Sequence, residues 1–327
     1  MIRTALSTIP GSPAKDCSFE EALAWLATAD DTPDELLWMD CGAPAPDELE
    51  ALEKTLGLHP LTVEDLTHRN QRAKLEEFPG YLFLVVHWFA SADTTAHPHE
   101  LHFILGRNWI ATIYDDRRIA PVEDAWQAFL RGHVREPYGA DGELYRLIDH
   151  LVDSHAPILT MIEDRLEHLS IQASKKEGAQ GDISRVVIVR RALMRVRRRL
   201  APQRDAIGAL SRREHGFISQ KSLFYFRDVS DHIHRQYESI ESLRELAQSV
   251  MEVQLALVER QQNLVVQRLT VVSTIFLPLN FLTGFFGMNF AHLPFADDRL
   301  LVVALASMAL LPSALLLWFR KKGWVGR

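Results

Sequence analysis

Two charge-free apolar segments near the C-terminus constrain this chain more than any other feature. Residues 269–288 and 300–319 contain no Asp, Glu, Lys or Arg. As helices, each would extend roughly 30 Å, the thickness of a bilayer's hydrocarbon core. The second segment, LLVVALASMALLPSALLLWF, is apolar all round, which favours lipid over the surface of a soluble protein. A buried hairpin in a soluble core is the alternative, but the pattern predicts two transmembrane helices.

Basic residues flank these segments asymmetrically. Arg268 precedes the first, and residues 320–322 (Arg-Lys-Lys) follow the second, whereas the connection 289–299 carries one basic residue and two acids. The positive-inside rule then places both termini in the cytosol and the short connection outside. The first fifteen residues hold no apolar run typical of a signal peptide. We therefore expect a multi-pass protein of the cell (inner) membrane, with membrane lipid as a partner.

The front of the chain, from about residue 35 to 131, mixes strand and helix patterns. A nearly continuous apolar run of strand length indicates a strand covered on both faces. Two further apolar runs flank Gly106-Arg107-Asn108, which is typical of a hairpin. We therefore predict one α/β domain of αβα type. Its expected elements are strands at 81–89, 102–105 and 109–114, and helices at 47–56 and 122–129.

Charge is unevenly distributed along the chain. Residues 1–150 hold 26 Asp and Glu against 12 Lys and Arg, a net charge of −14, whereas residues 151–327 have a net charge of +7. An acidic front half suits a domain that gathers cations and does not suit nucleic acid as a partner. The chain has no Walker loop, nucleophile elbow, dinucleotide fingerprint or Cys/His zinc framework. We expect a protein that is not an enzyme and has no prosthetic group.

Beyond Gly142 the pattern is helical. Apolar residues recur at three- and four-residue steps to about Leu169, and a second helix is expected from 183 to 213. A much longer helix then runs from 223 to 288, with apolar residues at a 3.5-residue period typical of a coiled-coil seam. A helix this long favours neighbouring copies as the partner of the seam, and a bundle within one chain is the alternative. The seam comprises positions 226, 229, 233, 236, 240, 243, 247, 250, 254, 257, 261 and 264.

These patterns divide the chain into seven expected regions. They are a cytosolic α/β domain (1–141), a cytosolic helical hairpin (142–221), a stalk helix (222–268), a first transmembrane pore helix (269–289), an extracytosolic loop (290–299), a second transmembrane helix (300–319) and a basic cytosolic tail (320–327).

The first apolar span carries polar residues at helical spacing, and these suggest a cation pore. Amide and hydroxyl oxygens could contact a hydrated ion, and the aliphatic positions between them could close the pore by dewetting. Mg2+ gives up its water reluctantly, so neutral oxygens around its hydration shell are suitable. An interhelical hydrogen bond is the alternative role of Asn280. The residues on this face, the pore stripe, are Asn263, Val266, Leu269, Ser273, Leu277, Asn280, Gly284 and Gly287.

The end of this span, Gly287-Met288-Asn289, resembles the signature of the CorA family of magnesium and cobalt transport proteins. The preceding residues, 269–279 and Thr283-Gly284, are similar to that family too, as are Tyr225–Val229 and His59–Asp65. The resemblance implies a funnel-shaped homopentamer. Gly287, Met288 and Asn289 would form the selectivity filter. The pore stripe would line the ion path.

The same resemblance implies that Asp228 belongs to an intersubunit regulatory site that closes the pore when cytosolic Mg2+ is high. The second acid would come from a neighbour's N-terminal domain. Two departures leave the metal open among Mg2+, Co2+, Ni2+ and Zn2+, and proton coupling open as well. Asn280 stands where the family has Thr, and residues 291–295 lack a Glu. A membrane-anchored metal sensor, with the spans as a mere anchor, is an alternative of a different class.

Three groups of polar residues have competing interpretations. Asp228 and His232 share a helix face, as a metal site or as a solvated surface. The patch His97, His99 and His102 could hold Zn2+ or Co2+, or form an ordinary polar loop. The arginines between 185 and 199 could pair with an acidic domain of a neighbouring copy, bind anionic lipid or face water.

Overall fold

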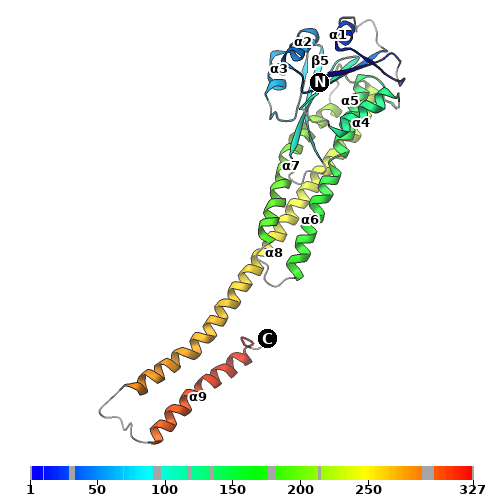
Figure 1. The fold of residues 1–327 in the computed structure, drawn as a ribbon. Coiled ribbons are helices and arrows are strands. Elements are labelled where there is room, and N and C mark those ends of the chain that lie inside the picture. The colour runs from blue at the N-terminus through cyan, green and yellow to red at the C-terminus, as the bar shows by residue number, and fades with distance from the viewer. Residues whose placement is uncertain are drawn as a thin grey trace. The chain divides into compact units, whose positions relative to one another are not determined.

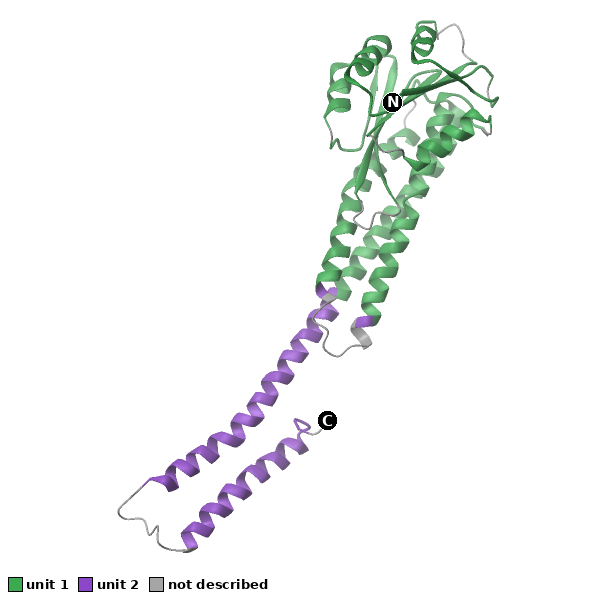
Figure 2. Cartoon of the chain, in the orientation of Figure 1, with its two compact units in different colours: residues 1–171, 184–250 green, residues 172–183, 251–327 purple. Residues whose placement is uncertain are grey.

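The structure is a computed structural model that describes residues 2–9, 11–28, 34–68, 70–90, 97–115, 119–132, 136–175, 182–212, 215–288 and 298–325 (Figure 1). The chain forms two compact units, which are coloured separately in Figure 2. The first comprises residues 1–171 and 184–250, and the second comprises residues 172–183 and 251–327. The helix α8 continues from the first unit into the second.

The first unit begins with a seven-stranded sheet in the order β2-β1-β3-β7-β6-β5-β4. Only the β3–β7 pairing is parallel among the described strands. The predicted hairpin is confirmed, because β6 and β7 pair in an antiparallel register with Leu105 opposite Ile110. The strands are β1 (Ile2–Ser7), β2 (Lys15–Cys17), β3 (Leu36–Gly42), β4 (Lys74–Phe78), β5 (Tyr81–Phe89), β6 (Pro98–Leu105) and β7 (Trp109–Tyr114).

Helices cover both faces of this sheet, as the apolar strand at 81–89 predicted. All nine residues of β5 are buried. On one face Leu37, Met39 and Phe83 join a core with residues of three short helices. On the other face, Trp38 packs edge-on against Trp126 at 5.0 Å between ring centroids. The helices are α1 (Phe19–Leu26), α2 (Pro46–Leu56) and α3 (Pro60–Thr67) on the first face, and α4 (Ala120–Leu130) with α5 (Ala140–Asp153) on the second.

Local sequence signals define the ends of these short helices. Ser18 and Glu21 form a capping box at the start of α1, which satisfies two backbone N–H groups. Gly57 ends α2 in the left-handed conformation with φ of 61°, where a side chain would be strained. Gly57 thus ends α2 before α3 begins at Pro60.

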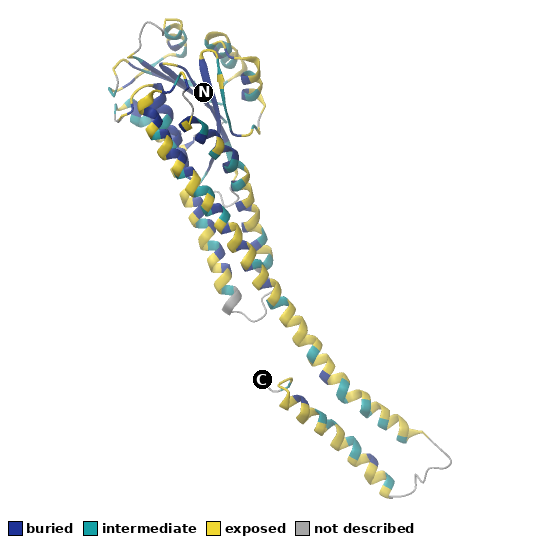
Figure 3. Cartoon of the chain, turned by 180° about the vertical axis from the view of Figure 1, so that it is seen from behind, coloured by how far each residue is buried: buried dark blue, intermediate teal, exposed yellow. Residues whose placement is uncertain are grey.

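Three long helices extend from the α/β part of the first unit, and they run side by side in Figures 1 and 3. The expected continuous helix beyond Gly142 is divided, because α5 ends at Asp153 and α6 begins at Ala156. Apolar residues of all three helices form their common core. The three are α6 (Ala156–Lys175), α7 (Asp182–Arg212) and the first part of α8 (Gln220–Gly287).

The structure corrects our assignment of the coiled-coil seam to neighbouring copies. Seam residues Phe226, Val229, Ile233 and Ile240 have no exposed surface within the single chain, and Val250 is only 3% exposed. Their partners are helices of the same unit, so the intramolecular bundle was the correct alternative for this part. Leu264, the last seam position, is 45% exposed in the single chain and has no such cover.

The second unit contains both apolar segments as helices. α8 reaches Gly287, and α9 (Asp298–Lys321) holds the other segment. Both helices are long and apolar enough to cross a membrane, and only 6% of each apolar window is buried. Figure 3 shows these stretches as mostly exposed.

Candidate functional site

The pore stripe lies on one exposed face of the C-terminal part of α8. Val266 is 60% exposed, Leu269 65% and Leu277 74%. The polar members Asn263, Ser273 and Asn280 are exposed as well, as is Gly284. The helix is continuous from Gln220 to Gly287, so the 3.6-residue period assumed for the stripe applies throughout. Polar and aliphatic side chains therefore alternate along a single line.

Hydrogen bonding separates the stripe from the other polar residues of this span. The hydroxyl of Thr270 donates to the carbonyl of Val266 at 2.8 Å, and Thr274 donates to Thr270 at 2.8 Å. Thr283 donates to the Leu279 carbonyl at 3.0 Å. These threonines satisfy their own donors within the helix, a common arrangement for hydroxyls in apolar helices.

The polar stripe residues behave differently. Within the described part of the chain, the side chains of Asn263, Ser273 and Asn280 have no hydrogen-bond partner. Ser273 and Asn280 belong to the apolar span, where a polar group without a partner is costly unless it faces water or another chain. The three side chains are thus available to an aqueous path or to a second copy.

The expected selectivity filter is only partly described. Gly287 is the last residue of α8, and Met288 follows with 53% of its surface exposed. The Met288 backbone N–H donates to the Phe285 carbonyl at 3.3 Å. Asn289 and residues 291–295 lie outside the described residues.

A second candidate site lies between α5 and α8 in the first unit. Nε2 of His232 is 3.9 Å from Oδ1 of Asp228, one helical turn earlier on α8. Nδ1 of His232 is also 3.9 Å from Oδ1 of Asp153 on α5. Ligand atoms of Asp149, Asp153 and His232 lie within 4.8 Å of one another, a spacing at which they could hold a metal ion. We call these four residues the α5–α8 cluster.

Electrostatics make the α5–α8 cluster receptive to a cation. Burial raises the pKa of Asp149, and the negative charge of Asp153 raises it further. Burial together with Asp149 and Asp228 raises the pKa of Tyr145 to about 12, so both carboxylates act on the same phenol. Crowded carboxylates destabilise one another's charged forms, and a bound divalent cation would relieve that repulsion.

Sequence reasoning singled out Asp228, as part of an intersubunit site, and did not single out the two acids of α5. It expected the second acid from a neighbour's N-terminal domain, and that expectation stays a prediction. The signal for Asp149 and Asp153 was their four-residue spacing in Leu147–Asp153, which places both on one helix face. His232, for which the sequence analysis left a metal site and a solvated surface open, lies 3.9 Å from a carboxylate oxygen on each of the two helices.

The histidine patch at the start of β6 does not gather into one site. His99 lies against Trp88 at 5.3 Å between ring centroids, whereas His102 is buried and its Nε2 is 2.7 Å from Oε1 of Glu100. Alternation along β6 sends the side chains of His99 and His102 to opposite faces of the sheet. No metal-ligand group among the described residues includes them.

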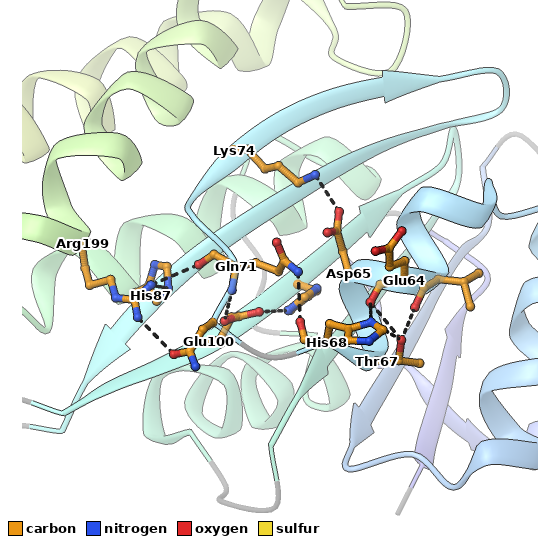
Figure 4. Close-up of polar contacts among 12 residues, drawn as sticks. Glu64, Asp65, Thr67, His68, Gln71, Lys74, His87, Glu100 and Arg199 are labelled. Carbon is orange, nitrogen blue, oxygen red and sulfur yellow. Dashed lines mark hydrogen bonds and ion pairs between the residues drawn. The ribbon is translucent and has the colours of Figure 1, made fainter.

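A polar network, drawn in Figure 4, attaches α7 to the sheet. Nη1 of Arg199 on α7 is 3.3 Å from Nε2 of His87 on β5 and donates to the Gln71 carbonyl at 3.2 Å. The Gln71 backbone N–H donates to Glu100 at 2.9 Å. Burial and the Arg199 charge lower the pKa of His87 to about 4, so its imidazole is neutral and can accept from the guanidinium. The network therefore joins the α/β layers to the helical bundle.

Comparison with known proteins agrees with this fold. The sequence profile described as "CorA-like Mg2+ transporter protein" matches residues 33–321. YfjQ of Bacillus subtilis is 31% identical over 297 residues, covering 88% of this chain and 89% of its own. The cobalt/magnesium transport protein CorA of Thermotoga maritima is 30% identical over 286 residues, covering 85% of this chain and 80% of its own.

A solved structure has the same fold over the whole length. The complete structure of the CorA magnesium transporter from Methanocaldococcus jannaschii matches with a TM-score of 0.82 at 21% identity, covering 99% of both chains. At this identity the likeness establishes the fold alone. The profile match spans most of the sequence and ends at the last residue of α9. On these grounds the chain belongs to the family of CorA-like Mg2+ transporter proteins.

Proposed function

We propose that this chain transports divalent metal cations, Mg2+ and Co2+ among them, into the cytosol through a homopentameric channel in the cell membrane. Family membership supports the transport of divalent cations. An inside-negative potential of 100 mV favours influx of a divalent cation by about 4.6 kcal/mol, so conduction down the gradient needs no nucleotide. Both termini lie in the cytosol in this proposal.

The observation that carries the proposal is the unsatisfied state of the three polar stripe residues. Asn263, Ser273 and Asn280 have no partner among the described residues, while the off-stripe threonines bond to their own helix. Copies of α8 arranged around an axis would turn these amide and hydroxyl oxygens toward a common water-filled path. Neutral oxygens suit Mg2+ because the ion keeps its hydration shell.

In this channel Gly287, Met288 and Asn289 form the outer filter, and the Asn289 amides contact the hydrated ion. The aliphatic rings of Val266, Leu269 and Leu277 close the path by excluding water. Gly284 leaves room between neighbouring helices.

The α5–α8 cluster is the regulatory site of the proposal. Cytosolic Mg2+ bound by Asp149 and Asp153 would hold α8 against α5 and favour the closed channel. Asp228, on the other side of His232, would bind Mg2+ together with an acid from a neighbouring copy. His232 adds a nitrogen ligand, which Co2+, Ni2+ or Zn2+ accepts more readily than Mg2+. This imidazole is the observation that favours a transition-metal transporter on the same scaffold as the second candidate.

The decisive experiment is metal uptake into liposomes that contain the purified chain. Mg2+, Co2+, Ni2+ and Zn2+ are compared, each at several proton gradients. Uptake that follows the metal gradient and the membrane potential supports a channel, whereas uptake that needs a proton gradient supports the coupled alternative. No uptake of any of the four metals would contradict transport.

The variant Asn289→Ala separates the channel from a membrane-anchored sensor. A channel loses uptake while its oligomer still assembles. A sensor would keep its response to metal, because its spans serve only as an anchor.

A further inference from the structure

The arginines of α7 divide into two sets with different surroundings. One set is used within the chain, where it holds α7 against α8 and the sheet. Arg197 pairs with Glu241 of α8, Arg199 belongs to the network with His87, and Arg204 lies over the Tyr237 ring at 4.4 Å. These contacts account for the side of α7 that faces the bundle.

The other set points away from the bundle. Arg191, Arg195 and Arg198 are exposed, and no ion pair joins them to a carboxylate in the part of the chain that the structure describes. Met194, 41% exposed, and Ile188, 57% exposed, lie among them. Arginine and methionine around an apolar centre are typical of protein interfaces. A purely solvated face would not need these exposed apolar side chains.

The outward face of α6 also combines exposed charged residues with an exposed apolar residue, but its charges are acidic. Asp164 and Glu167 are exposed, and neither forms an ion pair within the described residues. Ile171, 42% exposed, lies one turn beyond Glu167 on the same side of the helix. Each helix therefore carries an exposed apolar residue flanked by charges, acidic on α6 and basic on α7.

The two faces lie at the same level of the bundle. α6 and α7 are antiparallel neighbours, and Asp164 and His168 line one groove together with Arg185, Ile188 and Val189. Arg191 is thus within about one helical turn of the level of Asp164. Copies related by rotation about an axis along α8 meet at equal levels. Within one chain, residues 185–189 of α7 lie beside α6, whereas α7 meets the sheet farther along, at Arg199.

We propose that the outward arginine face of α7 in one copy docks onto the acidic face of α6 in the next copy. The contact is heterologous, with different surfaces on its two sides, and such a contact builds a ring when the rotation between copies closes. This inference rests on the proposed assembly of copies and adds to it the surfaces that meet.

Two charge-reversed chains test the docking in trans. The first, Arg191→Glu with Arg195→Glu, is acidic on both helices. The second, Asp164→Arg with Glu167→Arg, is basic on both. Each chain alone should assemble roughly tenfold less well than the unaltered chain, because like charges then meet at every contact. Co-expressed with different tags, the two should co-purify as mixed oligomers and assemble better than either chain alone. In a five-membered ring, four of the five contacts can then join an acidic α7 to a basic α6 or the reverse, and one contact still joins like charges.

The controls separate the competing explanations. Lys15→Glu with Arg131→Glu makes the same charge change on exposed residues of the α/β domain and should leave assembly unchanged. A chain with all four reversals should assemble like the unaltered chain, because every contact between its copies is again complementary. Rescue in that chain with no gain at all on co-expression would mean that the faces pair within a copy, and would overturn the inference. A third outcome is that only the arginine-reversed chain assembles weakly and that co-expression does not rescue it. That result would overturn the inference and would indicate that the arginines bind an anionic lipid. An unaltered chain that is monomeric in this assay would instead contradict the proposed assembly.

Discussion

Nδ1 of His232 on α8 lies 3.9 Å from Oδ1 of Asp153 on α5, which brings the imidazole of the long helix to a carboxylate of the helix beneath the sheet. Asp228 stands at the same distance on the other side of the ring. A cation held here would tie the helix that bears the pore stripe to the α/β part of the first unit. Changes at these residues should therefore alter closure by metal without altering the ion path.

Asp228→Lys should weaken closure by cytosolic Mg2+. A repelling charge replaces a carboxylate beside the proposed ion. Even one pair of unit charges about 4 Å apart interacts by about 1–4 kcal/mol in a solvated setting, so half-closure should need at least about tenfold more Mg2+. Current recordings at stepped Mg2+ concentrations measure this shift. Asp231→Lys, an exposed neighbour outside the cluster, is the matched control. Equal shifts for both variants would argue against the site.

His232→Gln should change the response to Co2+ and Zn2+ more than the response to Mg2+. Imidazole is a good ligand for these transition metals, whereas Mg2+ prefers oxygen. We expect inhibition by Co2+ or Zn2+ to weaken by about tenfold and inhibition by Mg2+ to change by less than about twofold. His234→Gln is the control, because His234 bonds to the Ser230 carbonyl of its own helix at 2.6 Å. A similar change in inhibition by all three metals would show that the imidazole of His232 is not a metal ligand.

Asn280→Leu should reduce Mg2+ uptake by roughly tenfold or more, since it replaces an oxygen of the ion path by an apolar group. Thr283→Val is a matched control on the same helix, because the Thr283 hydroxyl is already bonded to the Leu279 carbonyl at 3.0 Å. Both variants are compared by uptake into liposomes at equal protein density. Equal loss in both would mean that Asn280 stabilises the helices and does not line the path.

Leu243→Ala and Leu264→Ala should differ although both occupy the seam. Leu243 is 4% exposed and Leu264 is 45% exposed in the single chain. The first substitution leaves a cavity in the bundle and should lower the unfolding free energy of the first unit by about 2–5 kcal/mol. Leu264→Ala should change the unfolding free energy of the first unit little, and any effect it has should be on assembly. Denaturant unfolding followed by circular dichroism in detergent distinguishes the two.

His155 should make the first unit sensitive to acid. Burial lowers its pKa to about 4, from 6.5 in the unfolded chain. The folded state then binds fewer protons, so this contribution to stability is complete above pH 6.5 and is lost as the pH falls toward 4. The loss should be roughly 3 kcal/mol.

The pH test compares the unaltered chain with His155→Gln. The variant should lose less stability between pH 6.5 and 4, since no imidazole has to be kept neutral. His234→Gln, at an exposed position, should keep the steeper dependence. Parallel curves for all three chains would show that His155 is not the source of the acid sensitivity.

Much of the fold could be predicted because its signals are local. The apolar run at 81–89 became β5 with the same bounds, and the glycine between two apolar runs became the turn of the β6–β7 hairpin. The division at Ser154-His155 was not predicted, because apolar periodicity continues across it while the backbone turns. Periodicity reports which face is apolar and does not report what covers that face.

The same limit applied to the candidate sites. The pore stripe was found because its residues belong to one continuous helix, where spacing alone defines a face. Asp149 and Asp153 were missed because their partner, His232, lies on another helix. The histidine patch was suggested by closeness in sequence, but strand alternation separates His99 from His102.

By itself, the sequence determined the two membrane-length apolar helices, the stripe of amides and hydroxyls along one of them, and the resemblance carried by Gly287-Met288-Asn289. These properties depend on residues close together on one element, whose geometry is nearly invariant. Only the tertiary structure decided that Phe226 to Val250 pack inside their own chain, and that α5 supplies carboxylates beside His232. Packing between distant segments depends on the whole core, which no local spacing encodes.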